Sequence, residues 1–169
     1  LAYIGGRNGK IYVFDNQTLR IVYTIQVQGS VPESNFVGLA VVGGWLYAAE
    51  NTRLIRVNIN QMDSEFLSEI QIVNLGLTLT NGFQAIAVNN MSYLALTETV
   101  GSRWGWSGNS PSGHIYIIDI NKIDALGDIE SKYIVHIAPN DFENARGRQP
   151  ANIISGTGNA EFILSSEQD

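Results

Sequence analysis

The stretch FVGLAVVGGWLYAAE, residues 36–50, contains two apolar runs that meet at Gly43-Gly44. Apolar residues fill nearly every position of both runs, which is typical of β-strands that are buried on both faces. A glycine pair between two such runs is typical of a tight hairpin turn. We therefore predict two antiparallel strands, 36–41 and 45–50.

The same pattern recurs along the chain. Two further strands, 53–58 and 67–72, complete a unit of four. A second unit of four strands is predicted at 83–88, 93–98, 114–119 and 132–137. Three strands precede the first unit (2–5, 11–15 and 21–27), and two follow the second unit (150–155 and 161–166). Helix is expected to be scarce, with a single helical turn within 122–126.

Four-stranded units that repeat about every 40–45 residues are typical of β-propeller blades, whose faces are apolar because each blade lies between two others. The third strands begin at Ile11, Leu54 and Ile115, so the first step is roughly 43 residues and the second roughly 61. The second step is longer because a loop at 100–113 is inserted. We predict an all-β fold of antiparallel blades.

The predicted arrangement is one segment, residues 1–169, with two complete and two partial blades. The complete blades are 36–72 and 83–137, and the partial ones are 1–27 and 150–166. Thirteen strands are too few for a closed ring of four or more blades, so we expect an arc of a larger propeller with about six to eight blades. The remaining blades would come from the same or another chain. The alternative is a two-layer β-sandwich, whose strands also alternate.

Several short motifs resemble the YVTN-type, WD40-like family of β-propeller repeats. The motifs are GLAV at 38–41, GG at 43–44, LYAA at 46–49, VFD at 13–15 and TI at 24–25. The segment 148–153, RQPANI, is similar to the proline-containing lead-in to an inner strand of those repeats. The resemblance implies a β-propeller fold.

Composition narrows the classes of partner. The formal charge of −6 comes from acidic residues that are spread along the chain, which argues against binding to nucleic acid. Without cysteine the chain has no disulfide and no thiolate metal site. No apolar run approaches the roughly 18 residues that would span a bilayer, so no membrane span is predicted.

Two polar segments interrupt the repeat and are predicted to lie on the same face of the propeller. One is the insertion after the second strand of the second full blade, and the other is the connection 140–148. Tryptophan, arginine and asparagine are enriched where apolar area and directional hydrogen bonds meet a partner. The predicted binding residues are Arg103, Trp104, Trp106, Asn109, Arg146 and Arg148. Alternatively, the two tryptophans cap the blade, and the arginines are solvated or paired locally.

Carboxylates stand at or near the end of the second strand in three units, at Glu50, Glu98 and Glu167. If they converge near a propeller axis, they could hold Ca²⁺ or another divalent cation, as in metal-dependent propeller hydrolases. Solvated strand ends are the simpler interpretation. The two histidines, His114 and His136, lie inside predicted strands and are interpreted as structural, so no catalytic residue is predicted.

These features favour a non-enzymatic scaffold of a secreted or cell-surface protein that binds a protein or a glycan and needs no cofactor. The alternative is a lactonase-like hydrolase with a metal near the central channel. A third reading is a purely structural arc that positions other domains. All three rest on fold, which alone does not define function.

Overall fold

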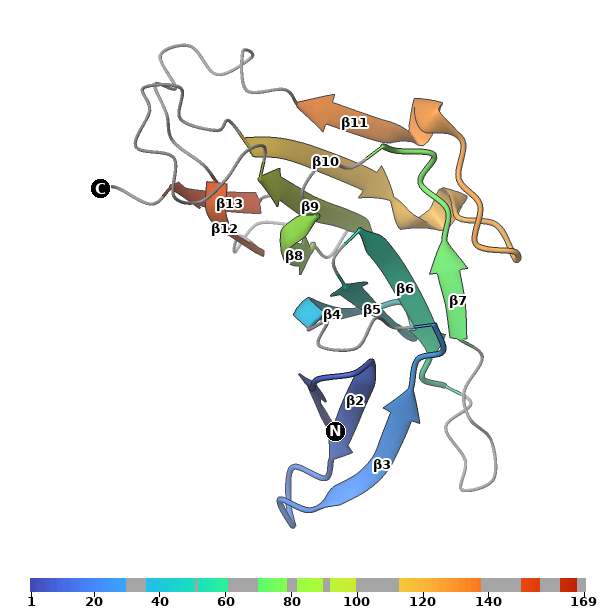
Figure 1. The fold of residues 1–169 in the computed structure, drawn as a ribbon, viewed down its shortest axis with the longest axis vertical. Helices are drawn as coiled ribbons and strands as arrows, with labels where there is room; N and C mark the ends of the chain where they lie inside the picture. Colours follow the sequence, from blue (N-terminus) through green and yellow to red (C-terminus); the bar gives the residue numbers. More distant parts are fainter. Residues whose placement is uncertain are drawn as a thin grey trace.

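The computed structural model shows an all-β chain of antiparallel sheets, as predicted (Figure 1). It describes residues 1–29, 36–50, 52–60, 70–78, 82–89, 92–99, 113–137, 150–155 and 162–166, the last two ranges as backbone only. None of the described sheets closes on itself.

The strands form four sheets in chain order. The first sheet contains β1 (Ala2–Gly5), β2 (Lys10–Phe14) and β3 (Ile21–Gln26). The second contains β4 (Phe36–Val42), β5 (Trp45–Glu50), β6 (Arg53–Asn58) and β7 (Ile70–Val73). The third contains β8 (Phe83–Val88), β9 (Tyr93–Thr99), β10 (Gly113–Asp119) and β11 (Ile134–Ile137). The fourth pairs β12 (Pro150–Ser155) with β13 (Phe162–Ser166).

The turn between β4 and β5 has the geometry that the sequence predicted. Val42 pairs with Trp45, and the two residues between them have positive φ, 58° at Gly43 and 78° at Gly44. Positive φ at both central residues defines a type I′ turn, whose twist matches that of the flanking strands. The glycine pair therefore fixes the register of β4 on β5.

The second sheet lies between the first and the third (Figure 1), and its inner strands β5 and β6 are buried on both faces. Along β5, Leu46 and Ala48 join a cluster with the first sheet, whereas Tyr47 and Ala49 join a cluster with the third sheet. Alternate residues of a strand point to opposite faces, so a strand with apolar residues at every position can pack on two sides. Each sheet interface therefore depends on one alternating set of side chains.

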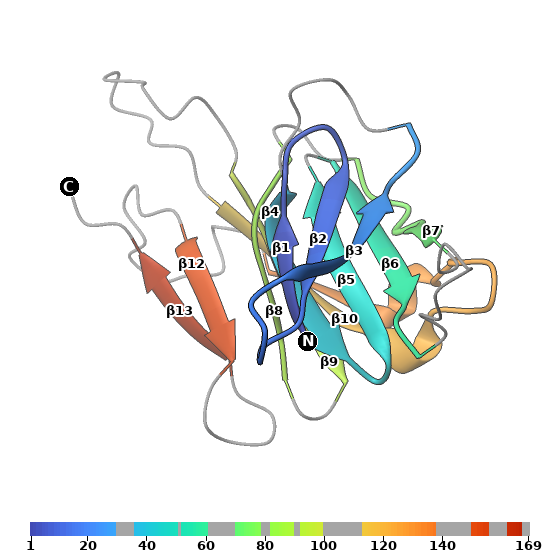
Figure 2. The same ribbon diagram turned by 90° about the horizontal axis from the view of Figure 1, so that it is seen from below.

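The first strands of successive sheets lie side by side. β4 contacts β8, and β8 contacts β12 (Figure 2). Ala85 and Ala87 of β8 and Ala95 of β9 form a separate cluster of small buried side chains, on the two strands that contact β12. Small side chains at these positions allow β12 to approach the third sheet closely.

The first strands also share an irregularity that we did not predict. The register of each shifts near its start, between Phe36 and Gly38 in β4, between Phe83 and Ala85 in β8, and between Pro150 and Asn152 in β12. A bulge bends a strand and increases its twist. The three first strands thus share a register shift near their starts.

The connection between β10 and β11 differs from the prediction in two ways. The helical turn lies at Ile120–Lys122 rather than within 122–126, because the side chain of Asp119 accepts a hydrogen bond from the backbone N–H of Asn121 and begins the turn there. A second 3₁₀ turn, Ser131–Tyr133, delays the start of β11 to Ile134.

Replacing Ile55 with alanine should test the interface between the first and second sheets. Ile55 is fully buried, and we expect Ile55→Ala to lower the free energy of unfolding by about 2–5 kcal/mol. The matched control is Ile72→Ala, because Ile72 pairs with Ile55 on the neighbouring strand but is 54% exposed. The control should lose about 1 kcal/mol or less in chemical denaturation. Equal losses would contradict the two-sided packing.

Candidate functional site

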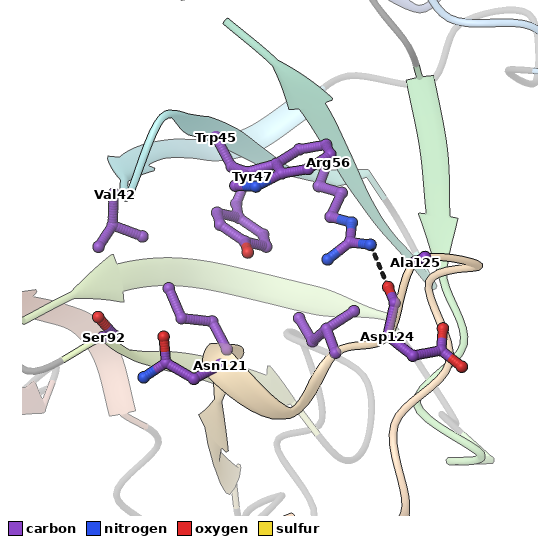
Figure 3. A pocket seen from close by; sticks show the side chains of 11 residues that line it. Val42, Trp45, Tyr47, Arg56, Ser92, Asn121, Asp124 and Ala125 are labelled. Atoms are coloured by element: carbon purple, nitrogen blue, oxygen red, sulfur yellow. Dashed lines mark hydrogen bonds between the residues drawn. The ribbon is translucent and has the colours of Figure 1, made fainter. Parts of the chain in front are cut away.

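Polar side chains gather at the two opposite ends of the second and third sheets. One end holds the β4–β5 turn and the 3₁₀ turn after β10. Between the sheets at this end lies a pocket of about 330 Å³ (Figure 3). Its lining residues are Val42, Gly43, Trp45, Tyr47, Arg56, Ser92, Ile120, Asn121, Ile123, Asp124 and Ala125.

Arg56 is the central polar group of this pocket. The strand pattern places it on the face that meets the third sheet, opposite Tyr47, and it is only 4% exposed. Its guanidinium carbon lies 4.4 Å from the ring centre of Trp45, a cation–π arrangement. Its Nε donates to Oε1 of Gln71 at 2.7 Å.

Arg56 also connects the two sheets. Its Nη2 donates to the backbone carbonyl of Asp124, as the dashed line in Figure 3 shows. Gln71, the cross-strand partner of Arg56, donates from Nε2 to the carbonyl of Ala125 at 2.9 Å. Two neighbouring side chains of the second sheet thus hold two successive carbonyls of the third sheet's β10–β11 connection.

The turn that receives Arg56 is ordered by its own carboxylate. Oδ1 of Asp124 accepts hydrogen bonds from the backbone N–H groups of Leu126 at 2.8 Å and Asp128 at 2.9 Å. Hydrogen bonds from the Asp128 and Leu126 backbone lower the pKa of Asp124 below its usual range. The carboxylate therefore stabilises the turn, while the carbonyl of the same residue accepts from Arg56.

The pocket can hold a small polar group. The Tyr47 side chain points into it from the second sheet, and Ser92 and Asn121 lie across it on the third sheet (Figure 3). Burial raises the pKa of Tyr47, and the neighbouring Arg56 opposes this rise, so the phenol stays protonated at neutral pH. Hydroxyl and amide groups beside an aromatic wall are suited to hydrogen bonding with a neutral ligand.

The opposite end of the sheets contains two of the predicted carboxylates, and both are buried rather than solvated. Glu50 is 1% exposed and Glu98 is 2% exposed. Glu50 forms an ion pair with Arg53, its partner on β6. Oε2 of Glu98 accepts a hydrogen bond from the Tyr116 hydroxyl at 2.8 Å. Our expectation of solvated strand ends was wrong here, because the third strand of each sheet supplies a donor.

Glu50 and Glu98 occupy equivalent positions in their sheets. Glu50 follows Leu46 and Ala48 on the face toward the first sheet, and Glu98 follows Leu94 and Leu96 on the face toward the second. Glu167 lies outside the described residues. Within the part of the chain that the structure describes, no three metal-ligating side chains come together.

The Glu98 end also contains both histidines. Nδ1 of His114 and Nε2 of His136 are 2.5 Å apart, on the same face of the third sheet as Tyr116. Burial and the Glu98 hydrogen bond raise the pKa of Tyr116 well above its usual value. We interpreted both histidines as structural from the sequence, and the structure joins them in one cluster with Tyr116.

The predicted binding residues lie outside the described part of the chain. This applies to Arg103, Trp104, Trp106, Asn109, Arg146 and Arg148. Conversely, sequence reasoning missed Arg56, although a charged residue between Ile55 and Val57 in a buried strand is a usable signal.

Comparison with protein-family models, with characterised proteins and with solved structures finds no match to this chain. In the described ranges, no helix combines the length and the apolar character needed to cross a membrane.

Substituting lysine for Arg56 should test the connection between the sheets. Arg56→Lys keeps the charge but loses the planar group that stacks on Trp45 and donates to Gln71. We expect the free energy of unfolding to fall by about 1–3 kcal/mol. Arg7→Lys, at an exposed position, is the control and should have no measurable effect in the same denaturation series. An unchanged stability for Arg56→Lys would show that the guanidinium contacts contribute little.

Proposed function

We propose that this chain is an arc of a YVTN-type β-propeller that acts as a non-enzymatic binding scaffold. In this proposal the four sheets are successive blades, and remaining blades come from the same or another chain. The partner is a protein or a glycan, and the setting is a secreted or cell-surface protein. The main support is the packing of the second sheet between two equivalent neighbours.

Three repeated features support the arrangement as blades. The first strands β4, β8 and β12 have register shifts at matching positions and follow one another in space. The equivalent second strands, β5 and β9, each have a buried glutamate at or next to their last residue, on the face toward the preceding sheet. In a propeller the first strands line the axis and every blade repeats the same contacts with its neighbours.

The binding face in this proposal is the end at which Glu50 and Glu98 lie. The segments that contain Trp104, Trp106 and Arg146 connect to the third sheet at this end, directly before β10 and after β11. The hydrogen bond between Glu98 and Tyr116 fixes the strands beneath these connections. A rigid base reduces the entropy cost of binding, which suits a scaffold.

The described carboxylates support a scaffold more than a metal-dependent hydrolase. Glu50 is held by Arg53, and Glu98 is held by Tyr116, each within its own sheet. A metal ligand would have to give up such a buried partner, at a cost in stability.

The contact between β4 and β8 offers a test of the blade arrangement. A Cβ added at Gly38 would lie 2.5 Å from Cγ2 of Ile86, so Gly38→Ala should destabilise the protein by about 1–3 kcal/mol. Ile86→Ala removes the obstructing group and creates space. The double variant should therefore be more stable than the sum of the two single effects predicts, as measured in a double-mutant cycle. Additive losses would indicate that the two strands do not meet as proposed.

Replacing Trp104 and Trp106 together with alanine should test the binding face. The expected result is loss of capture on a glycan array and on a panel of immobilised extracellular proteins, with an unchanged melting temperature. Trp45→Phe, at the other end of the sheets, is the control and should retain capture. A large fall in melting temperature for the double variant would instead assign the tryptophans a capping role. Absence of any capture by the parent chain would contradict the binding proposal.

A further inference from the structure

We propose that His114 and His136 form a binding site for a divalent transition-metal ion of the Zn²⁺, Cu²⁺ and Ni²⁺ class. This site differs from the carboxylate site considered at Glu50, Glu98 and Glu167 in both ligand type and metal. It does not rest on the propeller proposal, since it needs only the local structure of the third sheet.

The first observation is the direction of the two imidazole rings. Nδ1 of His114 and Nε2 of His136 are 2.5 Å apart, much closer than the ring centres at 4.8 Å, and the ring planes differ by only 16°. The rings therefore meet nitrogen to nitrogen and edge to edge. The two nitrogens point at each other, and a single proton shared between them completes the hydrogen bond.

The second observation is that neighbouring groups hold the rings in place. Tyr116 pairs directly with His136 across the strands, and their parallel rings have centres 4.9 Å apart. The hydroxyl of Tyr116 is in turn fixed by Glu98, which is almost fully buried. Groups that orient the ligands in this way raise metal affinity, because less freedom is lost on binding.

The chemistry of the pair selects the class of metal. Neutral imidazole nitrogen is a preferred ligand of zinc, copper and nickel, whereas calcium and magnesium prefer oxygen. With Zn–N bonds of about 2.0–2.1 Å, tetrahedral geometry requires the two nitrogens to stand roughly 3.3 Å apart. The two nitrogens must therefore move apart by roughly 0.8 Å from the observed 2.5 Å, and the rings must also turn from their head-on line so that both lone pairs point at the ion, which requires rotation of the side chains about χ1 and χ2.

The surroundings allow a cation to reach the pair. His136 is exposed and His114 is half-buried, so solvent can deliver the ion and fill the remaining coordination positions. Glu98 lies directly opposite His114 in the register of β9 and β10, and its carboxylate favours a positive charge nearby. The result is a two-histidine site with open positions, which water or a group of a partner can occupy.

Titration of the untagged chain with Zn²⁺ alone, followed by calorimetry, tests this proposal. The parent should bind one equivalent, and His114→Gln and His136→Gln should each weaken binding by about tenfold or more. The chain has no other histidine, so the double variant removes every imidazole. Glu130→Gln, an exposed change shortly before β11, is the matched control and should bind as the parent does.

NMR spectroscopy with Ni²⁺ should locate the bound ion on the third sheet. Ni²⁺ should broaden amide NMR signals of β9, β10 and β11 in the parent and leave them sharp in the double variant. Circular dichroism of each variant should match the parent, because His136 is exposed and His114 is only half-buried, so that neither substitution leaves a fully buried cavity. The proposal is overturned if the parent binds no Zn²⁺ at millimolar concentration. It is also overturned if the histidine variants, folded by circular dichroism, bind Zn²⁺ as tightly as the parent.

Discussion

Two-sided burial of the second sheet is the constraint on which the rest of the structure depends. β5 and β6 place buried apolar side chains on both faces, one set against the first sheet and the other against the third. A sheet of this kind is stable only with a neighbour on each side. Polar groups are consequently restricted to the strand ends and to a few interior positions with specific partners.

Hydrogen bonds from polar side chains between the sheets fix the relative position of the sheets more narrowly than apolar contacts do. The buried Arg56 reaches the backbone of Asp124 on the third sheet, and Arg53, which is part-exposed at the start of β6, reaches the backbone of Gln28 just after β3. Burying such groups is favourable only when partners are in place, so each contact penalises a sliding of one sheet over another. Apolar surfaces alone would tolerate such sliding.

Sequence reasoning recovered the features that depend on local pattern. The apolar runs and the Gly43-Gly44 turn were enough to predict an all-β chain of antiparallel strands. It could not predict hydrogen bonds between residues that are far apart in the sequence, because these depend on the tertiary fold. Arg56 is satisfied by a carbonyl that is far away in the chain, and the burial of Glu98 depends on the hydroxyl of Tyr116. Neither partner is visible from the spacing within one strand.

The histidine cluster illustrates how strongly such a site depends on strand register. His136 lies opposite Tyr116, and His114 precedes Tyr116 by two residues, so the two histidines are diagonal neighbours on one face. Long or aromatic side chains can reach each other across such a diagonal. A shift of β11 by a single residue would move His136 to the other face of the sheet. The two 3₁₀ turns before β11 therefore also contribute to the site, because they precede the point at which β11 joins β10.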